Sequence, residues 1–358
     1  MKAIIFAGGA GTRLWPLSRK NSPKQFGQIF NGKSTLQLAV ARVEKIFGLD
    51  NIYISTNEAY VSIIKKQIPQ MPSVNIIAEP EKRDVGPAIG FNLITLQKGG
   101  YHGPIAILWA DHLMHNDSEF IWALQEGEKL IKQDPNRFVL IGEKPRYAEN
   151  NLGWIHVGQK IKSKMYKYEG WCYRPPLEKC QQMFASKQWI WNPGYWVVDL
   201  DFTLSLYQRY VPKMYQQLQV IADSIGTVKE AKVIREIYPT LESIHFDNAI
   251  MEKLPVNQAV VLTPNMGWSD PGTLYALKEA LTDKEDDNLS RGLCLNLEAK
   301  NSLVINEEKR KILTTIGLDG MIVINTEDAI IVVHKDQALR VKDLVAKMEK
   351  DPKLKKFT

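Results

Sequence analysis

The chain has 358 residues, a formal net charge of +6, 44% hydrophobic and 24% charged residues, which is typical of a globular protein with one large domain or two ordinary ones. Its three cysteines form no C-x-x-C pair and its six histidines show no zinc spacing, so a disulfide framework and structural zinc are not expected. The positive charge forms no long basic block, and it fits polyphosphate substrates as well as nucleic acid. Met1 leads into a strand rather than a signal peptide, and no apolar run has membrane-spanning length, so we expect a cytoplasmic protein.

Strand-like and helical segments alternate through the first half of the chain. Residues 34–47, for example, carry Leu36, Val40, Val43 and Phe47 at helical spacing. Such alternation predicts an α/β fold with a mostly parallel sheet, helices on both faces and ligands at the carboxyl ends of the strands. The predicted strands are 3–7, 52–56, 74–78, 104–109 and 138–142, and the predicted helices are 34–47, 59–67, 86–97 and 118–132.

The middle of the chain, from about residue 150 to 270, is rich in aromatic residues and interrupted. We expect most of its tryptophans to pack in the core, with one or two available to stack on a sugar. The tryptophans in question are Trp154, Trp171, Trp189, Trp191 and Trp196.

A polar run at residues 283–288 predicts a boundary between a large domain, residues 1–284, and a small β-rich domain, residues 285–358. Short apolar segments at close spacing follow the run, and no internal repeat is clean enough to predict a solenoid. The predicted strands are 294–297, 302–306, 311–317, 321–325 and 329–334, and a closing helix is predicted over 341–348.

A glycine-rich loop follows the first strand. The apolar run Lys2–Phe6 leads directly into Gly8-Gly9-Ala10-Gly11. Without a Cβ, such a loop lets backbone N–H groups close on a phosphate. Arg13 and Lys24 add cationic side chains nearby, although the loop matches neither common phosphate-binding pattern.

Two acidic residues far apart in the sequence are candidates for chemistry. Asp111 follows a predicted strand, and Asp270 lies in the turn-like segment Gly267–Gly272. Taken singly, the first can be a helix cap and the second a turn residue.

The block from Phe6 to Gly27 resembles the N-terminal signature of the sugar-nucleotide pyrophosphorylases, a family of nucleotidyltransferases. Trp15-Pro16-Leu17-Ser18 and Pro23-Lys24-Gln25-Phe26 are most similar to the branch that makes GDP-mannose. The resemblance implies a Rossmann-like catalytic domain, the nucleotide-diphospho-sugar transferase fold, and a β-helix-like C-terminal domain. It also implies guanylyl transfer from GTP to a hexose 1-phosphate, first of all mannose 1-phosphate, with release of pyrophosphate. The expected partners are these two substrates, without nucleic acid or membrane, and the expected assembly, if any, is a homodimer.

The resemblance extends to individual residues. The segments 107–112 and 267–272 look like the family's two metal-binding motifs, so Asp111 and Asp270 would hold the cofactor Mg²⁺, an ion that needs few carboxylates when substrate phosphates complete its shell. Trp109 departs from the family's proline. By the same match the catalytic residues would be Arg13, Lys24 and Arg174, and the nucleotide-binding residues would be Ala7, Gly8, Gly9, Gly11, Thr12, Glu79, Gly86 and Asp111.

Glu79 has a chemical reason to read the base. Guanine presents two adjacent donors, N1–H and N2–H₂, and a carboxylate offers two acceptors and no donor. The alternative to guanine recognition is that Glu79 is an ordinary surface glutamate before a proline. Next to it, Asp84-Val85-Gly86 departs from the family's Asn-Thr-Ala.

The predicted sugar pocket combines preserved and altered residues. Gly153 and Asn192 stand as in the family, and Arg174 can replace the lysine that meets the sugar phosphate, since both are cationic. Tyr173, however, stands where the family has a hydroxyl-binding glutamate, and Pro193 replaces serine. The sugar-binding residues implied are Gly153, Tyr173, Asn192 and Asp247, of which the last can also be only a helix cap.

Two alternatives remain open at this point. One keeps the chemistry with another sugar or nucleotide. The other is a catalytically weak relative that binds a nucleotide or nucleotide-sugar and regulates a partner. The intact Arg13, Lys24, Asp111 and Asp270 argue against the second, and the altered sugar motif keeps it open.

Overall fold

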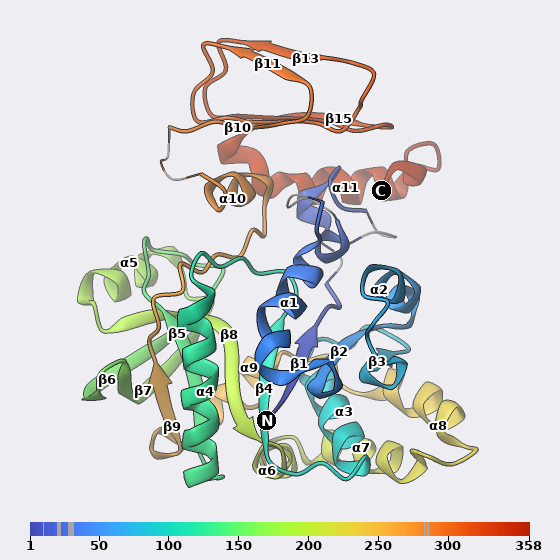
Figure 1. The fold of residues 1–358 in the computed structure, drawn as a ribbon, viewed down its shortest axis with the longest axis vertical. Coiled ribbons are helices and arrows are strands. Elements are labelled where there is room, and N and C mark those ends of the chain that lie inside the picture. The colour runs from blue at the N-terminus through green and yellow to red at the C-terminus, as the bar shows by residue number, and fades with distance from the viewer. Residues whose placement is uncertain (10, 20–22, 28–31, 283, 285) are drawn as a thin grey trace. The chain divides into compact units, whose positions relative to one another are not determined.

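The computed structural model describes residues 1–9, 11–19, 23–27, 32–282, 284 and 286–358 (Figure 1). It contains two compact units. Unit 1 comprises Met1–Gly8, Ala39–Ala110 and Met114–Trp268, and unit 2 comprises Gly9–Leu38, Asp111–Leu113 and Ser269–Thr358. The glycine-rich signature segment therefore belongs mostly with the C-terminal residues.

Unit 1 is built on a nine-stranded sheet with the order β3-β2-β1-β4-β8-β5-β9-β7-β6. The four strands β3, β2, β1 and β4 are all parallel, as the strand–helix alternation predicted. The strands are β1 (Lys2–Phe6), β2 (Ile52–Asn57), β3 (Ile76–Glu79), β4 (Pro104–Trp109), β5 (Phe138–Glu143), β6 (Gly153–Lys162), β7 (Met165–Tyr173), β8 (Trp189–Asp199) and β9 (Ala259–Leu262).

The aromatic-rich middle of the chain supplies the antiparallel part of this sheet. β8 lies between β4 and β5 and is antiparallel to both, and β6 and β7 form a hairpin at the sheet edge. β8 is buried almost throughout. Apolar and polar residues therefore do not alternate along it, and the sequence lacks the usual pattern that predicts a strand. The predicted α/β fold with a parallel-rich sheet is confirmed.

Helices cover the sheet, with α4 and α1 in front of the strands in the view of Figure 1. One large core joins residues of β1 and β4 to α3, α6, α7 and α9. Trp154, Trp191 and Trp196 are at most 1% exposed, which confirms core packing for most of the tryptophans. The helices of unit 1 are α1 (Thr35–Phe47, which begins in unit 2), α2 (Val61–Gln67), α3 (Val85–Lys98), α4 (Asp117–Gln133), α5 (Leu177–Ser186), α6 (Leu200–Tyr210), α7 (Pro212–Ser224), α8 (Glu230–Ile237) and α9 (Phe246–Ala249).

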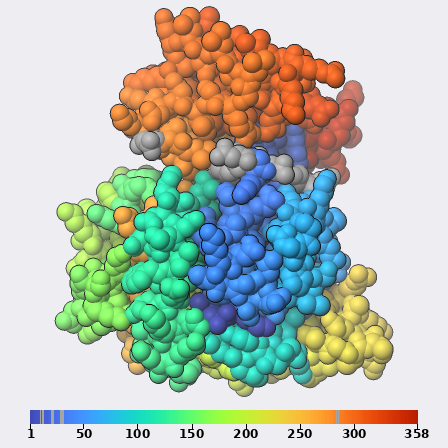
Figure 2. Space-filling model, viewed as in Figure 1, coloured from blue at the N-terminus to red at the C-terminus, as the bar shows by residue number. Residues whose placement is uncertain are grey.

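Unit 2 holds the predicted β-rich C-terminal region, whose atoms form one continuous body, orange in Figure 2. Leu303 pairs with Ile322 and Cys294 with Leu313 in parallel register, so two sheets advance together as in a β-helix. The expected β-helix-like domain with a closing helix is confirmed. Its elements are β10 (Leu289–Arg291), β11 (Cys294–Leu297), β12 (Leu303–Asn306), β13 (Leu313–Ile316), β14 (Met321–Asn325), the antiparallel β15 (Ile330–His334), α10 (Leu274–Glu279) and α11 (Val341–Lys350).

The predicted boundary at residues 284 and 285 stays a prediction. Positions 283 and 285 of its polar run lie outside the described residues. Within the described parts of the chain, every helix is too short or too polar to cross a membrane.

Candidate active site

The glycine-rich loop is shaped around Lys24. Gly11 has a φ of +63°, and a Cβ there would lie 2.9 Å from the backbone N, Cβ and Cγ of Lys24, so only glycine fits. The hydroxyl of Ser18 donates to the Gly11 carbonyl at 2.5 Å, and the amide of Gln25 donates to the Gly9 carbonyl at 3.0 Å. These bonds fold the loop onto the short helix at Lys24–Phe26.

The other predicted nucleotide-binding residues of this loop have surroundings different from those of Gly11. A Cβ at Gly8 or Gly9 would meet no atom within 4 Å, so packing within the described part of the protein does not explain these two glycines. Their contact with a phosphate stays a prediction. Ala7 is tied to β2 by its N–H to the Ser55 carbonyl at 2.8 Å. The side chain of Thr12 lies outside the described part of the structure.

Lys24 joins the two predicted metal ligands in unit 2. Its Nζ lies 2.6 Å from a carboxylate oxygen of Asp111 and 3.2 Å from one of Asp270, although the two acids are far apart in the sequence. Burial alone would raise the pKa of Asp111, but the Lys24 ammonium lowers it to about 2. Burial would likewise lower the pKa of Lys24, and the two carboxylates instead hold it above its ordinary value. Lys24 and Asp111 are therefore both charged at neutral pH.

A backbone bridge brings these acids together. Leu113 and Ser269 exchange both of their N–H···O bonds at 3.0 Å, which places the segments that carry Asp111 and Asp270 side by side. A Cβ at Gly272 would lie 3.6 Å from both Asp270 carboxylate oxygens and 3.7 Å from Nη2 of Arg13. The Arg13 guanidinium and the Asp270 carboxylate therefore both lie next to Gly272. The next helix along the chain, α4, has Asn116 rather than Asp111 as its N-cap.

The donor set fits a hard divalent cation. Asp111, His112 and Asp270 each offer one ligand atom, and these atoms lie within 4.8 Å of one another. Two carboxylates suit Mg²⁺, which takes oxygen ligands. His112 is an addition to the predicted site: its position directly after Asp111 was visible in the sequence, but no spacing rule assigned it a role.

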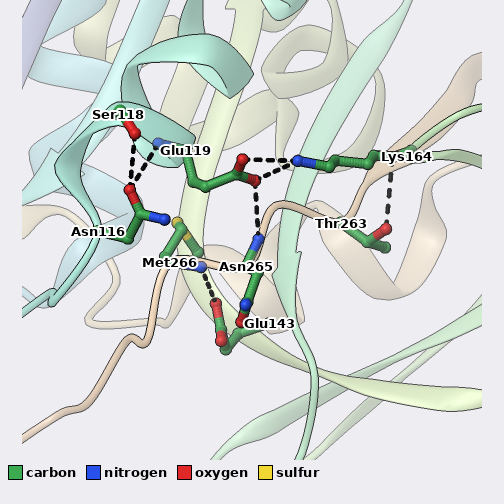
Figure 3. Close-up of polar contacts among 8 residues, drawn as sticks. All are labelled: Asn116, Ser118, Glu119, Glu143, Lys164, Thr263, Asn265 and Met266. Carbon is green, nitrogen blue, oxygen red and sulfur yellow. Dashed lines mark hydrogen bonds and ion pairs between the residues drawn. The ribbon is translucent and has the colours of Figure 1, made fainter.

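The segment that leads into residues 267–272 is held by polar groups of unit 1 (Figure 3). Glu119 accepts from Lys164 at 2.5 Å and from the Asn265 N–H at 3.1 Å, and Glu143 accepts from the Met266 N–H at 3.2 Å. Burial raises the pKa of Glu143 to about 7, against these backbone hydrogen bonds. None of these residues was among the predicted site residues.

Glu79 is a buried residue of β3, only 8% exposed, which rules out the surface alternative. One carboxylate oxygen accepts from the Tyr238 hydroxyl at 2.5 Å and the other from the Ser55 hydroxyl at 3.4 Å. Burial raises the pKa of Glu79 to about 7, and these two hydrogen bonds oppose the rise. An ionised carboxylate has about four lone-pair sites, so it can accept further donors. Its guanine-reading role stays a prediction.

The departure at Gly86 has a packing reason. A Cβ there would lie 2.6 Å from the Ile244 carbonyl oxygen, which accepts the Gly86 N–H at 2.9 Å. The Gly86 carbonyl in turn accepts from the Tyr207 hydroxyl at 2.5 Å. The alanine that the family pattern expects would clash here, and nucleotide contact by Gly86 stays a prediction.

Three predicted sugar-pocket residues are neighbours across strands. Gly153 of β6 lies opposite Tyr173 of β7 on one side and Asn192 of β8 on the other. A Cβ at Gly153 would lie 3.0 Å from the Trp171 ring and 3.5 Å from the Asn192 Cβ. The sequence motifs, separated by up to forty residues, therefore form one patch of unit 1. Nearby, the Trp109 indole donates to the Gly194 carbonyl at 2.8 Å, so this departure supports the turn after Asn192.

A charged cluster surrounds Tyr173. Arg174 has a φ of +46° and places its guanidinium carbon 5.0 Å from the Tyr173 ring centre. The His245 ring lies 5.4 Å from the same ring, and its Nδ1 lies 3.2 Å from a carboxylate oxygen of Asp84. Burial raises the pKa of Asp247 to about 7, and the nearby Arg174 opposes this. His245 was missed, although it stands two residues before Asp247.

Comparisons with known proteins show the family to which the chain belongs. Residues 2–287 match the model of the nucleotidyl transferase family, and the chain belongs to that family. Residues 292–348 match the MannoseP isomerase/GMP-like beta-helix domain. The chain is therefore a nucleotidyltransferase with an appended β-helix domain.

Its relatives carry mannose-related names. The mannose-1-phosphate guanylyltransferase of Salmonella montevideo is 29% identical over 97% of this chain and 73% of its own length. That of Klebsiella pneumoniae is 27% identical over 96% of this chain and 72% of its own length. A solved structure described as mannose-1-phosphate geranyltransferase from Thermus thermophilus has a TM-score of 0.87 at 25% identity, covering 97% of this chain and 99% of that one.

Proposed function

We propose that this nucleotidyltransferase transfers a guanylyl group from GTP to mannose 1-phosphate. The observation that carries the proposal is the ion pairing of Lys24 with both Asp111 and Asp270, in a segment where Gly11 of the glycine-rich loop packs on Lys24. Arg13 lies next to Gly272, as Asp270 does. This arrangement has the charges that a triphosphate needs at its α-phosphorus. The names of the relatives supply the sugar and the base.

In the proposed reaction an oxygen of the sugar phosphate attacks the α-phosphorus of GTP. The bond from that phosphorus to the β-phosphate bridging oxygen breaks, and pyrophosphate leaves with the electron pair. The attacking phosphate is ionised near neutral pH, its second pKa being about 6, so no general base is required. Catalysis then consists of alignment and charge neutralisation.

Each cationic residue has a proposed place in this reaction. Arg13 and the amides of Gly8, Gly9 and Gly11 would neutralise the leaving pyrophosphate, Lys24 would hold the α-phosphate, and Arg174 would place the attacking phosphate. Asp111 and Asp270 would hold Mg²⁺, and His112 lies beside them. When bound, the ion supplies positive charge to the substrate phosphates.

Base recognition through Glu79 gives a pH prediction. Glu79 must be ionised to accept both guanine donors, and its pKa is about 7, so the KM for GTP is expected to rise as the pH falls below 7. The variant Glu79→Gln should lose this dependence and narrow the preference for GTP over other nucleotides by about 10-fold, since a stranded donor costs about 1–3 kcal/mol.

Glu128→Gln is the control, because Glu128 is a partly buried glutamate of α4 that pairs with the Met1 ammonium and Lys132 and has no role in the proposed site. Steady-state kinetics with GTP, ATP, UTP and dTTP from pH 5.5 to 8.5 measure both effects. An unchanged nucleotide preference in Glu79→Gln would remove this residue from the base site.

Sugar choice is the direct test of the proposed function. Pyrophosphate release is measured with mannose, glucose and other hexose 1-phosphates, in the wild type and in Tyr173→Glu. A phenol provides one donor where the family's carboxylate gives two acceptors, and sites that bind a hydroxyl discriminate by as much as ~10⁴-fold. We expect kcat/KM for mannose 1-phosphate to be modest in the wild type and to rise in the variant.

Three outcomes count against parts of this proposal. High, selective mannose activity that Tyr173→Glu does not improve would show that the tyrosine is a neutral departure. Preference for another hexose would replace the sugar but keep the reaction. Binding of GTP without pyrophosphate release from any pair would favour the regulatory relative instead.

A further inference from the structure

The signature segment is packed into the C-terminal β domain. Leu14 and Trp15 are 2% and 6% exposed, and they share one core with residues of β12, β14, β15 and α11. All of these residues belong to unit 2. The turn that carries Arg13 therefore has its hydrophobic support far along the chain, outside the strand that precedes it.

Polar contacts also hold the same turn; we call Trp15, Arg19, Asp328 and the Phe357 carbonyl the polar clip. The Trp15 indole N–H donates to the main-chain carbonyl of Phe357 at 2.7 Å, and Arg19 donates to that carbonyl as well. Arg19 also pairs with Asp328 at 2.5 Å, and its guanidinium carbon lies 5.3 Å from the centre of the Trp15 ring. A planar guanidinium has five donors in a rigid fork, so it can hold several partners at once.

Trp15 and Arg19, which make these contacts, lie close to Arg13 along the backbone. Residues Thr12–Leu14 form a single helical turn, which continues through hydrogen bonds from the Leu17 and Ser18 N–H groups to the Leu14 carbonyl at 2.8 and 3.2 Å. Arg13 is two residues before Trp15 in this turn. The backbone from Arg13 to Ser18 therefore forms one hydrogen-bonded segment, and Trp15 lies within it.

We propose that Arg19 and Trp15 are positioning residues, which fix the Arg13 guanidinium by tying its turn to the Phe357 carbonyl and Asp328 of the C-terminal β domain. The domain is then part of the catalytic apparatus rather than an appendage. This inference rests on the proposed function, in which Arg13 binds the leaving pyrophosphate. Because misplacement of a catalytic group by about 1 Å can cost about 10²-fold in rate, a small loosening of the turn is sufficient.

The test compares Arg19→Leu with a matched control, Arg137→Leu. The Arg19 and Arg137 side chains are 20% and 29% exposed, and each pairs with an aspartate that is 45% exposed. Partly exposed ion pairs contribute little to global stability, so both variants should keep the wild-type melting temperature. Arg19→Lys retains the charge without the fork, and Trp15→Phe retains the ring without the indole N–H.

Two readouts separate positioning from general stability. In the reverse reaction, from GDP-mannose and pyrophosphate, Arg19→Leu should raise the KM for pyrophosphate about 10-fold, with Trp15→Phe and Arg19→Lys in between and Arg137→Leu unchanged. Amide hydrogen exchange of the peptide around residues 12–18 should increase in Arg19→Leu and not in Arg137→Leu. The exchange measurement requires no substrate.

The outcomes are distinguishable. Faster exchange at 12–18 with an unchanged KM for pyrophosphate overturns the positioning role, and so does identical behaviour of Arg19→Leu and Arg137→Leu in both measurements. A wild type that makes no GDP-mannose and releases no pyrophosphate refutes the proposed function, while the exchange experiment still shows whether the clip orders the turn.

Discussion

Alanine at Asp111 or at Asp270 is expected to lower kcat by about 10³-fold, because either change removes half of the carboxylate pair proposed to hold Mg²⁺. The double variant should cost little more than either single one, since the two residues act as a unit. Pyrophosphate release measures the effect, and EDTA should stop the wild-type reaction.

Asp117→Ala is the control for these variants. Asp117 also pairs with a cation at 2.6 Å, in this case Arg42, and has no role in the proposed site. A second readout is Mn²⁺ binding to the protein without nucleotide, which should be lost in Asp111→Ala and Asp270→Ala and kept in Asp117→Ala. A folded single variant with near wild-type turnover would contradict the metal assignment.

Lys24→Met is expected to change activity and metal binding in opposite directions. Turnover should fall by about 10²-fold, since the ammonium proposed at the α-phosphate is lost. Mn²⁺ should bind more tightly without nucleotide, because the Lys24 ammonium, at 2.6 and 3.2 Å from Asp111 and Asp270, no longer competes for the two carboxylates. Calorimetry with Mn²⁺ alone measures the second effect.

The stability of Lys24→Met has a predicted pH dependence. Asp111 has a pKa lowered to about 2 from 3.8, so its pairing stabilises the fold above pH 4 and is lost as the pH falls through 2. The deficit of the variant in melting temperature should therefore be full at pH 5 to 8 and shrink below pH 4. Lys98→Met, which removes a lysine from an exposed pair with Asp223, is the control. An unchanged Mn²⁺ affinity in Lys24→Met would show that the ammonium does not compete with the ion.

Local chemistry was sufficient for much of the fold, whereas the family resemblance supplied the roles of most candidate residues. The strand–helix alternation predicted the parallel strands β1 to β4 because fully buried strands and amphipathic helices leave distinct apolar patterns. Residue type was sufficient to make the glycine loop a candidate for phosphate binding. Asp111 and Asp270 became metal candidates only through the family resemblance, since each acid alone also fits a helix cap or a turn.

Residue type alone left other points undecided. Glu79 was compatible with an exposed position before a proline, and its contact with Tyr238, far along the chain, exists only in the folded protein. The family pattern could not explain Gly86, whose small size is required by the Ile244 carbonyl. His112 and His245 carry no signal of their own, because a histidine acquires its partners from the surrounding fold.

The sequence by itself determined which chemical groups are available: a flexible glycine turn, two cations and two acids, and a chain pattern that forms a parallel-rich sheet. Only the tertiary structure decided that Lys24 lies between Asp111 and Asp270, that Tyr173 and Asn192 flank Gly153, and that the Arg13 turn is supported by residues near Phe357. The physical reason is that side-chain preferences act over a few neighbouring residues. Ion pairs and packing depend instead on contacts between residues that can be hundreds of positions apart and meet only when the chain folds.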